Sequence, residues 1–232
     1  TNNLGFSNLL TYSFDVSFAV GELSREKGYG IYELATGKQL RKLSRATRFS
    51  TDGRWLVDLD ELAGTVTVFE PQTNRKVGTV QFCESTSAAS DEHNFGEWTS
   101  YVVSPTGRFV LVWSSRQGKL FDLNSGKQLF TLIDSRDEGT FRFTQFSAKF
   151  SPDEKTLVIG DLDEGIKTWR IEGGVPLQQF FSDGFESGPW STVATSNTVP
   201  IVSYNQELCV WDTSQRELRH KLVLEGRGQL RV

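Results

Sequence analysis

Short stretches in which apolar and polar residues alternate run along the whole chain, and residues typical of tight turns separate them. The clearest copy lies at 150–180, where the alternation predicts strands at 145–150, 156–159, 166–171 and 177–181. A period of two, with many β-branched and aromatic residues, is typical of strands, and no stretch shows the 3.6-residue period of an amphipathic helix. The pattern therefore predicts an all-β chain.

A two-part signature recurs five times, and a period of roughly 40 to 50 residues is typical of propellers and solenoids. The first part is a Ser/Asp/Pro/Gly turn between two apolar strands, at 12–15, 49–53, 103–107, 150–153 and, degraded, 193–197. The second part is an alternating strand that ends in an aromatic residue before another turn. The equivalent aromatics are Tyr32, Phe69, Phe121, Trp169 and Trp211. Each copy therefore predicts four antiparallel strands, named a to d, and stacked copies would bury both faces of each sheet.

The chain resembles the WD-repeat (Trp-Asp repeat) β-propeller family in two motifs. Val210-Trp211-Asp212 is similar to the Trp-Asp ending of its repeats, and 150–153 (Phe-Ser-Pro-Asp) is similar to its a-to-b turn. No Gly-His pair precedes any a-strand, so the resemblance is to a divergent member. It covers about 8–224 and implies one WD-like propeller domain over 1–232, with blades at about 8–44, 45–82, 98–133, 144–181 and 190–224. It also implies a rigid platform for protein contacts.

Composition excludes several classes of protein. The 232 residues carry a net charge of −4, which argues against nucleic acid as a partner. No apolar run is long enough to span a membrane, no signal peptide is visible and no glycosylation sequon occurs, which favours the cytoplasm. The two cysteines, Cys83 and Cys209, have no Cys or His neighbours at metal-ligand spacing, so neither a metal nor any cofactor is expected. The chain begins at Thr1 and contains no Met, which fits a part of a longer protein.

Connections in such a repeat leave from two opposite ends of each sheet. The a-to-b and c-to-d turns share one end, and the b-to-c and d-to-a connections share the other. Three d-to-a connections are long, at 83–98, 133–144 and 182–190, and long loops in a compact repeat are often functional. Acids concentrate at that end: Asp58, Asp60, Glu61, Glu84, Asp91, Glu92, Glu97, Asp134, Asp137, Glu138, Asp161, Asp163, Glu164, Asp183 and Glu186. Bases collect at the other: Lys38, Arg41, Lys42, Arg54, Arg75, Lys76, Arg108, Lys127, Arg216 and Arg219.

Acids beside aromatic residues are typical of a recognition surface for a cationic partner. We therefore predict that this acidic face binds a basic protein or peptide segment. Trp98, Phe141 and Trp190 have a second interpretation, as the first residues of a-strands that pack inward. The candidate binding residues are Asp91, Glu92, His93, Phe95, Glu97, Asp137, Glu138, Phe141, Asp161, Asp163, Glu164, Phe185 and Glu186.

Two other functions stay open at this point: a five-bladed glycoside hydrolase or glycan-binding protein, and a regulatory or sensor module. Five-bladed glycoside hydrolases need carboxylates converging on a central pocket, yet the expected a-strands TYSF, ATRF, SYVV, SAKF and STVA hold none. No catalytic residue is therefore predicted, and motifs of serine hydrolases, zinc proteases and nucleoside triphosphatases are absent. A regulatory or sensor module of a larger protein fits the same pattern. The oligomeric state and the identity of the partner stay open.

Overall fold

The computed structural model describes residues 6–23, 29–43, 47–61, 63–83, 100–113, 117–133, 147–161, 165–180, 191–192, 198–202, 207–212 and 217–223. These residues form strands, turns and one short 3-10 helix, so the all-β prediction is confirmed. No helix among them is long and apolar enough to cross a membrane. The chain divides into two compact units, residues 1–132 and 133–232.

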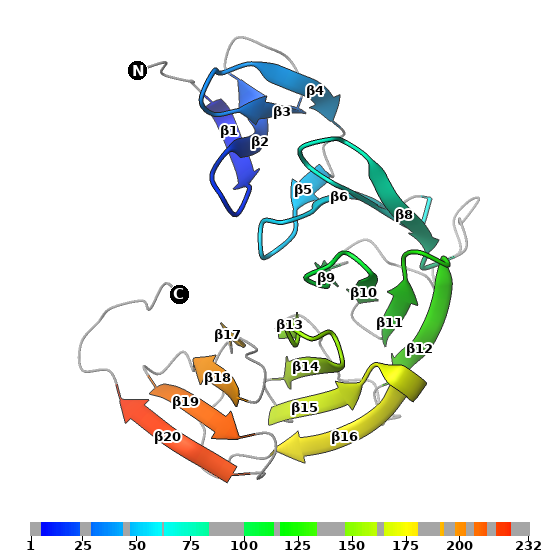
Figure 1. Ribbon diagram of the computed structural model, residues 1–232, viewed down its shortest axis with the longest axis vertical. Coiled ribbons are helices and arrows are strands. Elements are labelled where there is room, and N and C mark those ends of the chain that lie inside the picture. Colours follow the sequence, from blue (N-terminus) through cyan, green and yellow to red (C-terminus); the bar gives the residue numbers. More distant parts are fainter. Residues whose placement is uncertain are drawn as a thin grey trace, which may run out of the picture. The chain divides into compact units, whose positions relative to one another are not determined.

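The first unit contains three four-stranded antiparallel sheets, each with its strands in chain order (Figure 1). The first sheet consists of β1 (Phe6–Tyr12), β2 (Phe18–Leu23), β3 (Tyr29–Glu33) and β4 (Gln39–Leu43). The second consists of β5 (Thr47–Phe49), β6 (Leu56–Asp60), β7 (Thr65–Phe69) and β8 (Lys76–Gln81). The third consists of β9 (Ser100–Val103), β10 (Phe109–Trp113), β11 (Gln117–Asp122) and β12 (Lys127–Ile133).

The second unit contains two more sheets of the same order. The fourth sheet consists of β13 (Ser147–Phe150), β14 (Thr156–Asp161), β15 (Gly165–Arg170) and β16 (Val175–Phe180), with the 3-10 turn η2 (Glu172–Gly174) before β16. The fifth consists of β17 (Ser191–Thr192), β18 (Thr198–Val202), β19 (Glu207–Asp212) and β20 (Glu217–Val223). The four strands predicted for the clearest copy are thus confirmed, with ends shifted by a few residues.

Antiparallel order gives every sheet two distinct ends. We call the end that carries the a-to-b and c-to-d turns the turn end, and the opposite end, where b-to-c turns lie and strands d finish, the loop end. The repeat is also regular in register, because the five equivalent aromatics each pair with an apolar residue near the start of strand b. The pairs are Tyr32 with Ala19, Phe69 with Leu56, Phe121 with Val110, Trp169 with Leu157 and Trp211 with Val199.

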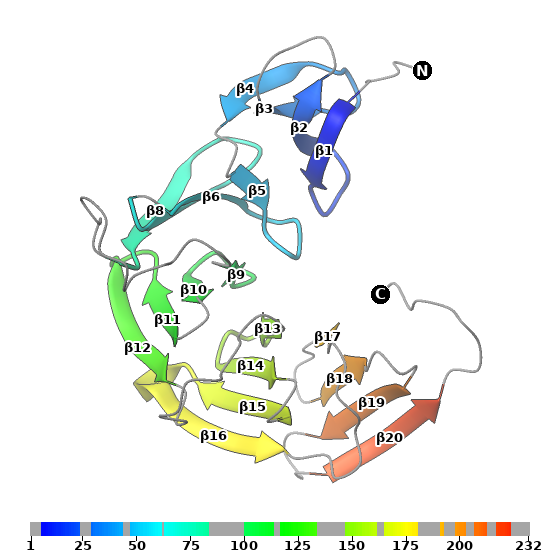
Figure 2. The same ribbon diagram turned by 180° about the vertical axis from the view of Figure 1, so that it is seen from behind.

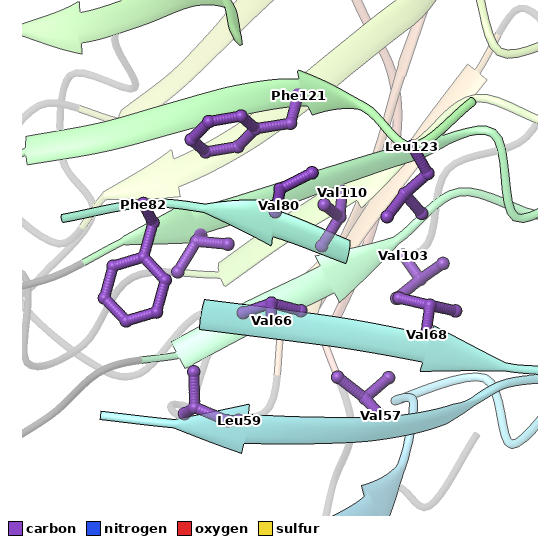
Figure 3. Packing of buried hydrophobic residues seen from close by; sticks show 11 residues of the cluster. Val57, Leu59, Val66, Val68, Val80, Phe82, Val103, Val110, Phe121 and Leu123 are labelled. Carbon is purple, nitrogen blue, oxygen red and sulfur yellow. The ribbon is translucent and has the colours of Figure 1, made fainter. Parts of the chain in front are cut away.

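The main core of the first unit lies between the second and third sheets. Alternate residues of the second sheet pack against apolar side chains of the third sheet in one buried cluster, which Figure 3 shows. Val66, Val68 and Val110 are fully buried there, and Phe121 is 2% exposed. Removal of this apolar surface from water is the main stabilising contribution between these sheets. The cluster comprises Val57, Leu59, Val66, Val68, Val80, Phe82, Val103, Val110, Val112, Phe121 and Leu123.

The opposite face of the second sheet meets the first sheet with a smaller core and several polar groups. Val20 and Ile31 pack against Phe49 and Leu56. Arg41 lies on the same face of the first sheet as Ile31, its register partner, and its guanidinium stacks 4.9 Å from the centre of the Phe69 ring. Arg41 was predicted at the turn end with the other bases, and that prediction is wrong, because alternation in β4 directs its side chain between two sheets.

Asp58 was predicted on the acidic face, and its position is also different. It lies inside β6, half-buried, and its Oδ1 accepts a hydrogen bond of 3.1 Å from the Thr47 hydroxyl. Burial lowers the pKa of Arg41, and Asp58 partly offsets that effect. Asp58 therefore belongs to the contact between the first two sheets and is not a solvent-facing acid.

Candidate functional site

Most of the predicted binding residues lie outside the described part of the chain. Asp161 is the exception: it is the last residue of β14, pairs with Gly165 and so lies at the loop end of the fourth sheet. For the other twelve residues the binding role stays a prediction. The others are Asp91, Glu92, His93, Phe95, Glu97, Asp137, Glu138, Phe141, Asp163, Glu164, Phe185 and Glu186.

The loop end of the second sheet is described, and it carries two exposed acids. Asp60 is the last residue of β6 and Glu61 follows it, and both are exposed. The Asp60 carboxylate accepts a hydrogen bond of 2.9 Å from the backbone N–H of Ala63, which fixes the tight b-to-c turn. The carboxylates of this turn therefore face water at a defined place.

The start of the first long connection is bonded to that same turn. Gln81 donates from Nε2 to the carbonyl oxygens of Ala63 at 2.6 Å and Cys83 at 2.5 Å. The Phe82 N–H donates to the Gly64 carbonyl at 2.8 Å, and Lys119 Nζ of the third sheet donates to the Phe82 carbonyl at 2.7 Å. The backbone just after β8 is thus held by hydrogen bonds from both the second and the third sheet.

Cys83 sits at this departure point as a half-buried free thiol. Burial raises the pKa of the thiol, and the nearby Lys119 offsets part of the rise. A raised pKa keeps the group protonated and weakly nucleophilic at neutral pH. Cys83 was predicted to be an apolar filler, and its environment is that of a structural side chain, although it is less buried than expected.

The turn end is built from one repeated set of hydrogen bonds. In each a-to-b turn of the first four sheets, a buried serine accepts at Oγ from the backbone N–H five residues later. These serines are Ser13, Ser50, Ser104 and Ser151, with distances of 3.0, 3.0, 2.9 and 3.0 Å. In three of the turns the serine hydroxyl donates to an aspartate two residues on: Asp15 at 2.7 Å, Asp52 at 2.6 Å and Asp153 at 2.6 Å.

These bonds have an electrostatic consequence. They lower the pKa of Asp15 and of Asp153, with the serine hydroxyl as the largest cause in both. A carboxylate that already accepts several hydrogen bonds is satisfied within its own turn. The acids of the turn end therefore shape the backbone and have few acceptor sites left for a partner.

The a-to-b turns of the first three sheets are linked into a continuous row, which we call the turn row (residues 12–18, 50–55 and 104–109). The Phe14 N–H donates to the Gly53 carbonyl at 2.9 Å, and the tips of the β1–β2 and β5–β6 hairpins lie side by side (Figures 1 and 2). Trp55 Nε1 donates to the Ser104 carbonyl at 3.1 Å. A Cβ on Gly107 would lie 2.7 Å from the Trp55 ring, so glycine permits this close approach.

Sequence reasoning missed the most exposed apolar side chains of the described residues. Tyr12, Phe14 and Val16 are 59%, 72% and 57% exposed. The sequence contained a signal for these exposed side chains. The a-to-b turns of the second to fourth sheets have Thr or Pro at the position of Phe14, and Gly or Glu at the position of Val16.

No group of three or more His, Cys, Asp or Glu side chains that could hold a metal ion occurs within the described ranges. The a-strands β1, β5, β9, β13 and β17 contain no Asp or Glu at all.

Comparison with known proteins identifies a fold and no more. No family model and no curated protein matches the chain. Among solved structures, it is similar to KlHsv2 with loop 6CD replaced by a Gly-Ser linker, with a TM-score of 0.60 and 13% identity over 94% of this chain and 71% of that one. It is also similar to Kuenenia stuttgartiensis hydrazine synthase, with a TM-score of 0.54 and 16% identity over 97% of this chain and 67% of that one. The repeated four-stranded sheets and this likeness show a β-propeller-like fold.

Proposed function

We propose that this chain is a non-catalytic scaffold or adaptor whose acidic loop end binds a basic segment of a partner protein. The observation that carries the proposal is the set of hydrogen bonds that holds the backbone where the first long connection begins, just after β8. Gln81 and Lys119 hold the backbone at Phe82 and Cys83, so the acidic segment that follows starts from a rigid base. Binding groups on rigidly supported segments lose less entropy when a partner binds.

Charge supports the same end of the sheets. Asp60 and Glu61 are exposed at the loop end of the second sheet, and each long connection runs from the end of a strand d to the start of a strand a, which is the loop end by topology. Acids gathered at one end attract a cationic partner, with a strong dependence on salt. A basic segment is therefore the expected partner, and nucleic acid or a membrane is not.

Within this proposal the five sheets are blades of a divergent WD-like propeller in a cytoplasmic protein. A regulatory or sensor module of a larger protein would use the same surface. The a-strands disfavour a glycoside hydrolase, because the carboxylates of that chemistry have no place on them. Propellers serve binding and catalysis alike, so the fold by itself decides neither.

The test is fluorescence anisotropy with a labelled Lys/Arg-rich peptide and the full chain. Neutralising Asp91, Glu92, Asp137 and Glu138 to Asn or Gln should weaken binding at least about tenfold and flatten its salt dependence. The matched control changes the same number of charges at turn ends: Glu33→Gln, Glu70→Gln, Glu154→Gln and Glu172→Gln. Alanine at Asp91, Phe95, Phe141 and Phe185 should also weaken binding. Equal affinities for the two charge variants, or no effect of the alanines, would overturn the proposal.

A further inference from the structure

The turn row combines exposed apolar side chains with a loop backbone that hydrogen bonds hold in place. Tyr12, Phe14 and Val16 lie within five residues, and each is more than half exposed. Ser13 and Ser17 both bond the Asp15 carboxylate, at 2.7 and 2.8 Å, which fixes the loop that presents these side chains. Apolar side chains held in water by a fixed loop are unfavourable for solubility, and such exposed patches often mark an interaction site.

Val16 adds a second, independent observation. Its φ is 57°, a left-handed conformation that a β-branched residue rarely adopts. The equivalent residues Gly53 and Gly107 have φ of 69° and 76°, so the turn itself requires this conformation and glycine suits it better. The first sheet thus keeps a strained, exposed valine where the next two sheets have glycine. Strain of this kind is a recognised mark of functional positions.

Two arginine side chains, Arg54 and Arg108, lie along the turn row beside this apolar tip. The Arg54 guanidinium stacks 5.6 Å from the centre of the Phe14 ring, and its Nε lies 3.8 Å from Asp52. Arg108, at the equivalent position of the next turn, uses its Nε on Asp122 at 3.2 Å. Both side chains are at least half exposed. A guanidinium has five N–H donors in a planar fork. Among the described residues none accepts a hydrogen bond from the terminal nitrogens of Arg54 or Arg108, so these nitrogens can bind a carboxylate from outside.

Asp52 is the acid nearest to these donors. Its Oδ1 accepts from the Ser50 hydroxyl at 2.6 Å and from the Arg54 backbone N–H at 3.2 Å, and its Oδ2 lies 3.8 Å from Arg54 Nε. Asp52 therefore faces the Nε side of Arg54 and not its terminal nitrogens. The third turn has Thr106 in place of an aspartate. An apolar tip is therefore followed, along the linked turns, by two arginines with unused donors.

We infer that the turn row is a second binding surface, which takes a peptide segment with an apolar side chain followed by acidic residues. The apolar residue packs on Phe14, Val16 and Tyr12, and the carboxylates bind Arg54 and Arg108. The chemistry is opposite to that of the loop end, where acids would take a basic segment. A chain with both surfaces would join two partners of opposite charge, as an adaptor does. The turn row uses no residue of the acidic face, so loss of binding at one surface can be distinguished from loss of binding at the other.

The experiment measures anisotropy of three labelled peptides of about 12 residues with the full chain. The first alternates Leu and Phe with Asp and Glu, the second replaces its acids with Lys, and the third replaces its apolar residues with Ser. The first should bind at least about tenfold more tightly than either of the others. Equal binding of the first and second, or of the first and third, would overturn the inference.

Variants then assign the binding to the turn row. Phe14→Ser and the pair Arg54→Gln with Arg108→Gln should each weaken binding of the first peptide at least about fivefold. Val16→Gly is the sharpest change, because it removes an exposed side chain and relieves the backbone, so it should lower affinity while the melting temperature stays the same or rises. Glu154→Gly and Lys155→Gln make the equivalent changes in the fourth sheet and should leave affinity unchanged.

Two results would contradict the assignment. Val16→Gly and Phe14→Ser with unchanged affinity would remove the apolar part of the surface. Tighter binding to anionic lipid vesicles than to the first peptide, lost in Phe14→Ser, would mean that the surface takes a membrane and not a peptide. Circular dichroism on each variant separates lost binding from lost folding.

Discussion

The two faces of the second sheet use the same strands for different chemistry. Towards the third sheet, Val57, Val66 and Val68 belong to a cluster of buried apolar side chains. Towards the first sheet, the residues between them include Asp58 and Thr67, and β4 of the first sheet contributes Arg41. One sheet can therefore have a mainly apolar contact, which provides stability, and a more polar contact, which provides orientation at a smaller gain in free energy.

Truncating an aromatic residue on each face gives the largest expected contrast. Phe121→Ala in the apolar contact should lower the free energy of unfolding by about 3–5 kcal/mol, because it leaves a cavity among fully buried side chains. Phe69→Ala, at the equivalent strand position but half-buried, should cost less than about half as much. Urea unfolding of both variants checks this, and equal losses would mean that the two contacts are energetically alike.

Close backbone approach distinguishes the apolar contact in a second way. A Cβ on Gly78 would collide with the Leu123 carbonyl oxygen across the two sheets. Gly78→Ala should therefore cost about 1–3 kcal/mol through overpacking. Gly118→Ala is the matched strand control, since its Cβ would lie 3.3 Å from a movable Leu132 methyl group, and its effect should be small. Thermal unfolding of both would show the difference, and similar melting temperatures would contradict it.

The polar contact can be tested by removing its charge. Arg41 Nε has no hydrogen-bond partner among the described residues, and burial lowers the pKa of the side chain. Arg41→Met keeps most of the volume and should leave stability unchanged or raise it by up to about 1 kcal/mol. Arg41→Ala should lower stability, because the stem that covers Phe69 is lost. Arg54→Met, with a similar stacking but an exposed side chain, is the control and should have little effect.

A stability loss of more than about 1 kcal/mol in Arg41→Met would contradict this view of the polar contact. It would mean that the guanidinium contributes a net attraction to Asp58 that outweighs its desolvation. The Thr47 hydroxyl would then be a minor partner of that carboxylate.

The smallest expected effect concerns acid sensitivity at the turn end of the third sheet. Burial raises the pKa of Asp122, but hydrogen bonds from Ser125 and Arg108 outweigh this effect, and the net result is a lowered pKa. A folded pKa below the unfolded value stabilises the fold above the unfolded pKa, and the contribution is lost as the pH falls through the folded pKa. Asp122→Asn should therefore be less stable than wild type at pH 7, and the gap should close below about pH 4.

The apolar contact contains no group that titrates in this range, so Phe121→Ala should show the same loss at pH 7 and pH 4. Urea unfolding at several pH values measures both variants. A gap between wild type and Asp122→Asn that stays constant down to pH 3 would contradict the assignment of the lowered pKa to this turn.

The strands, the turns and the repeat follow from local patterns in the sequence. Alternation placed Val66 and Val68 on one face and Thr67 on the other, because successive side chains of a strand point in opposite directions. Serine, aspartate and glycine at fixed spacing defined the a-to-b turns, because their side chains and φ values close such turns locally. The equivalent position of Tyr32, Phe69 and Phe121 followed from the same local rules.

Which face meets which neighbour, and which turns touch, depends on the packing of the sheets in three dimensions. Alternation could not tell that Arg41 and Asp58 face each other between two sheets, because a period of two separates the faces without saying what covers them. It could not tell that Phe14 stays exposed beside Arg54, since that depends on the hydrogen bond from Phe14 to Gly53, 39 residues away in the chain. Local patterns fix local geometry, whereas burial and charge pairing depend on contacts between segments that are distant in sequence.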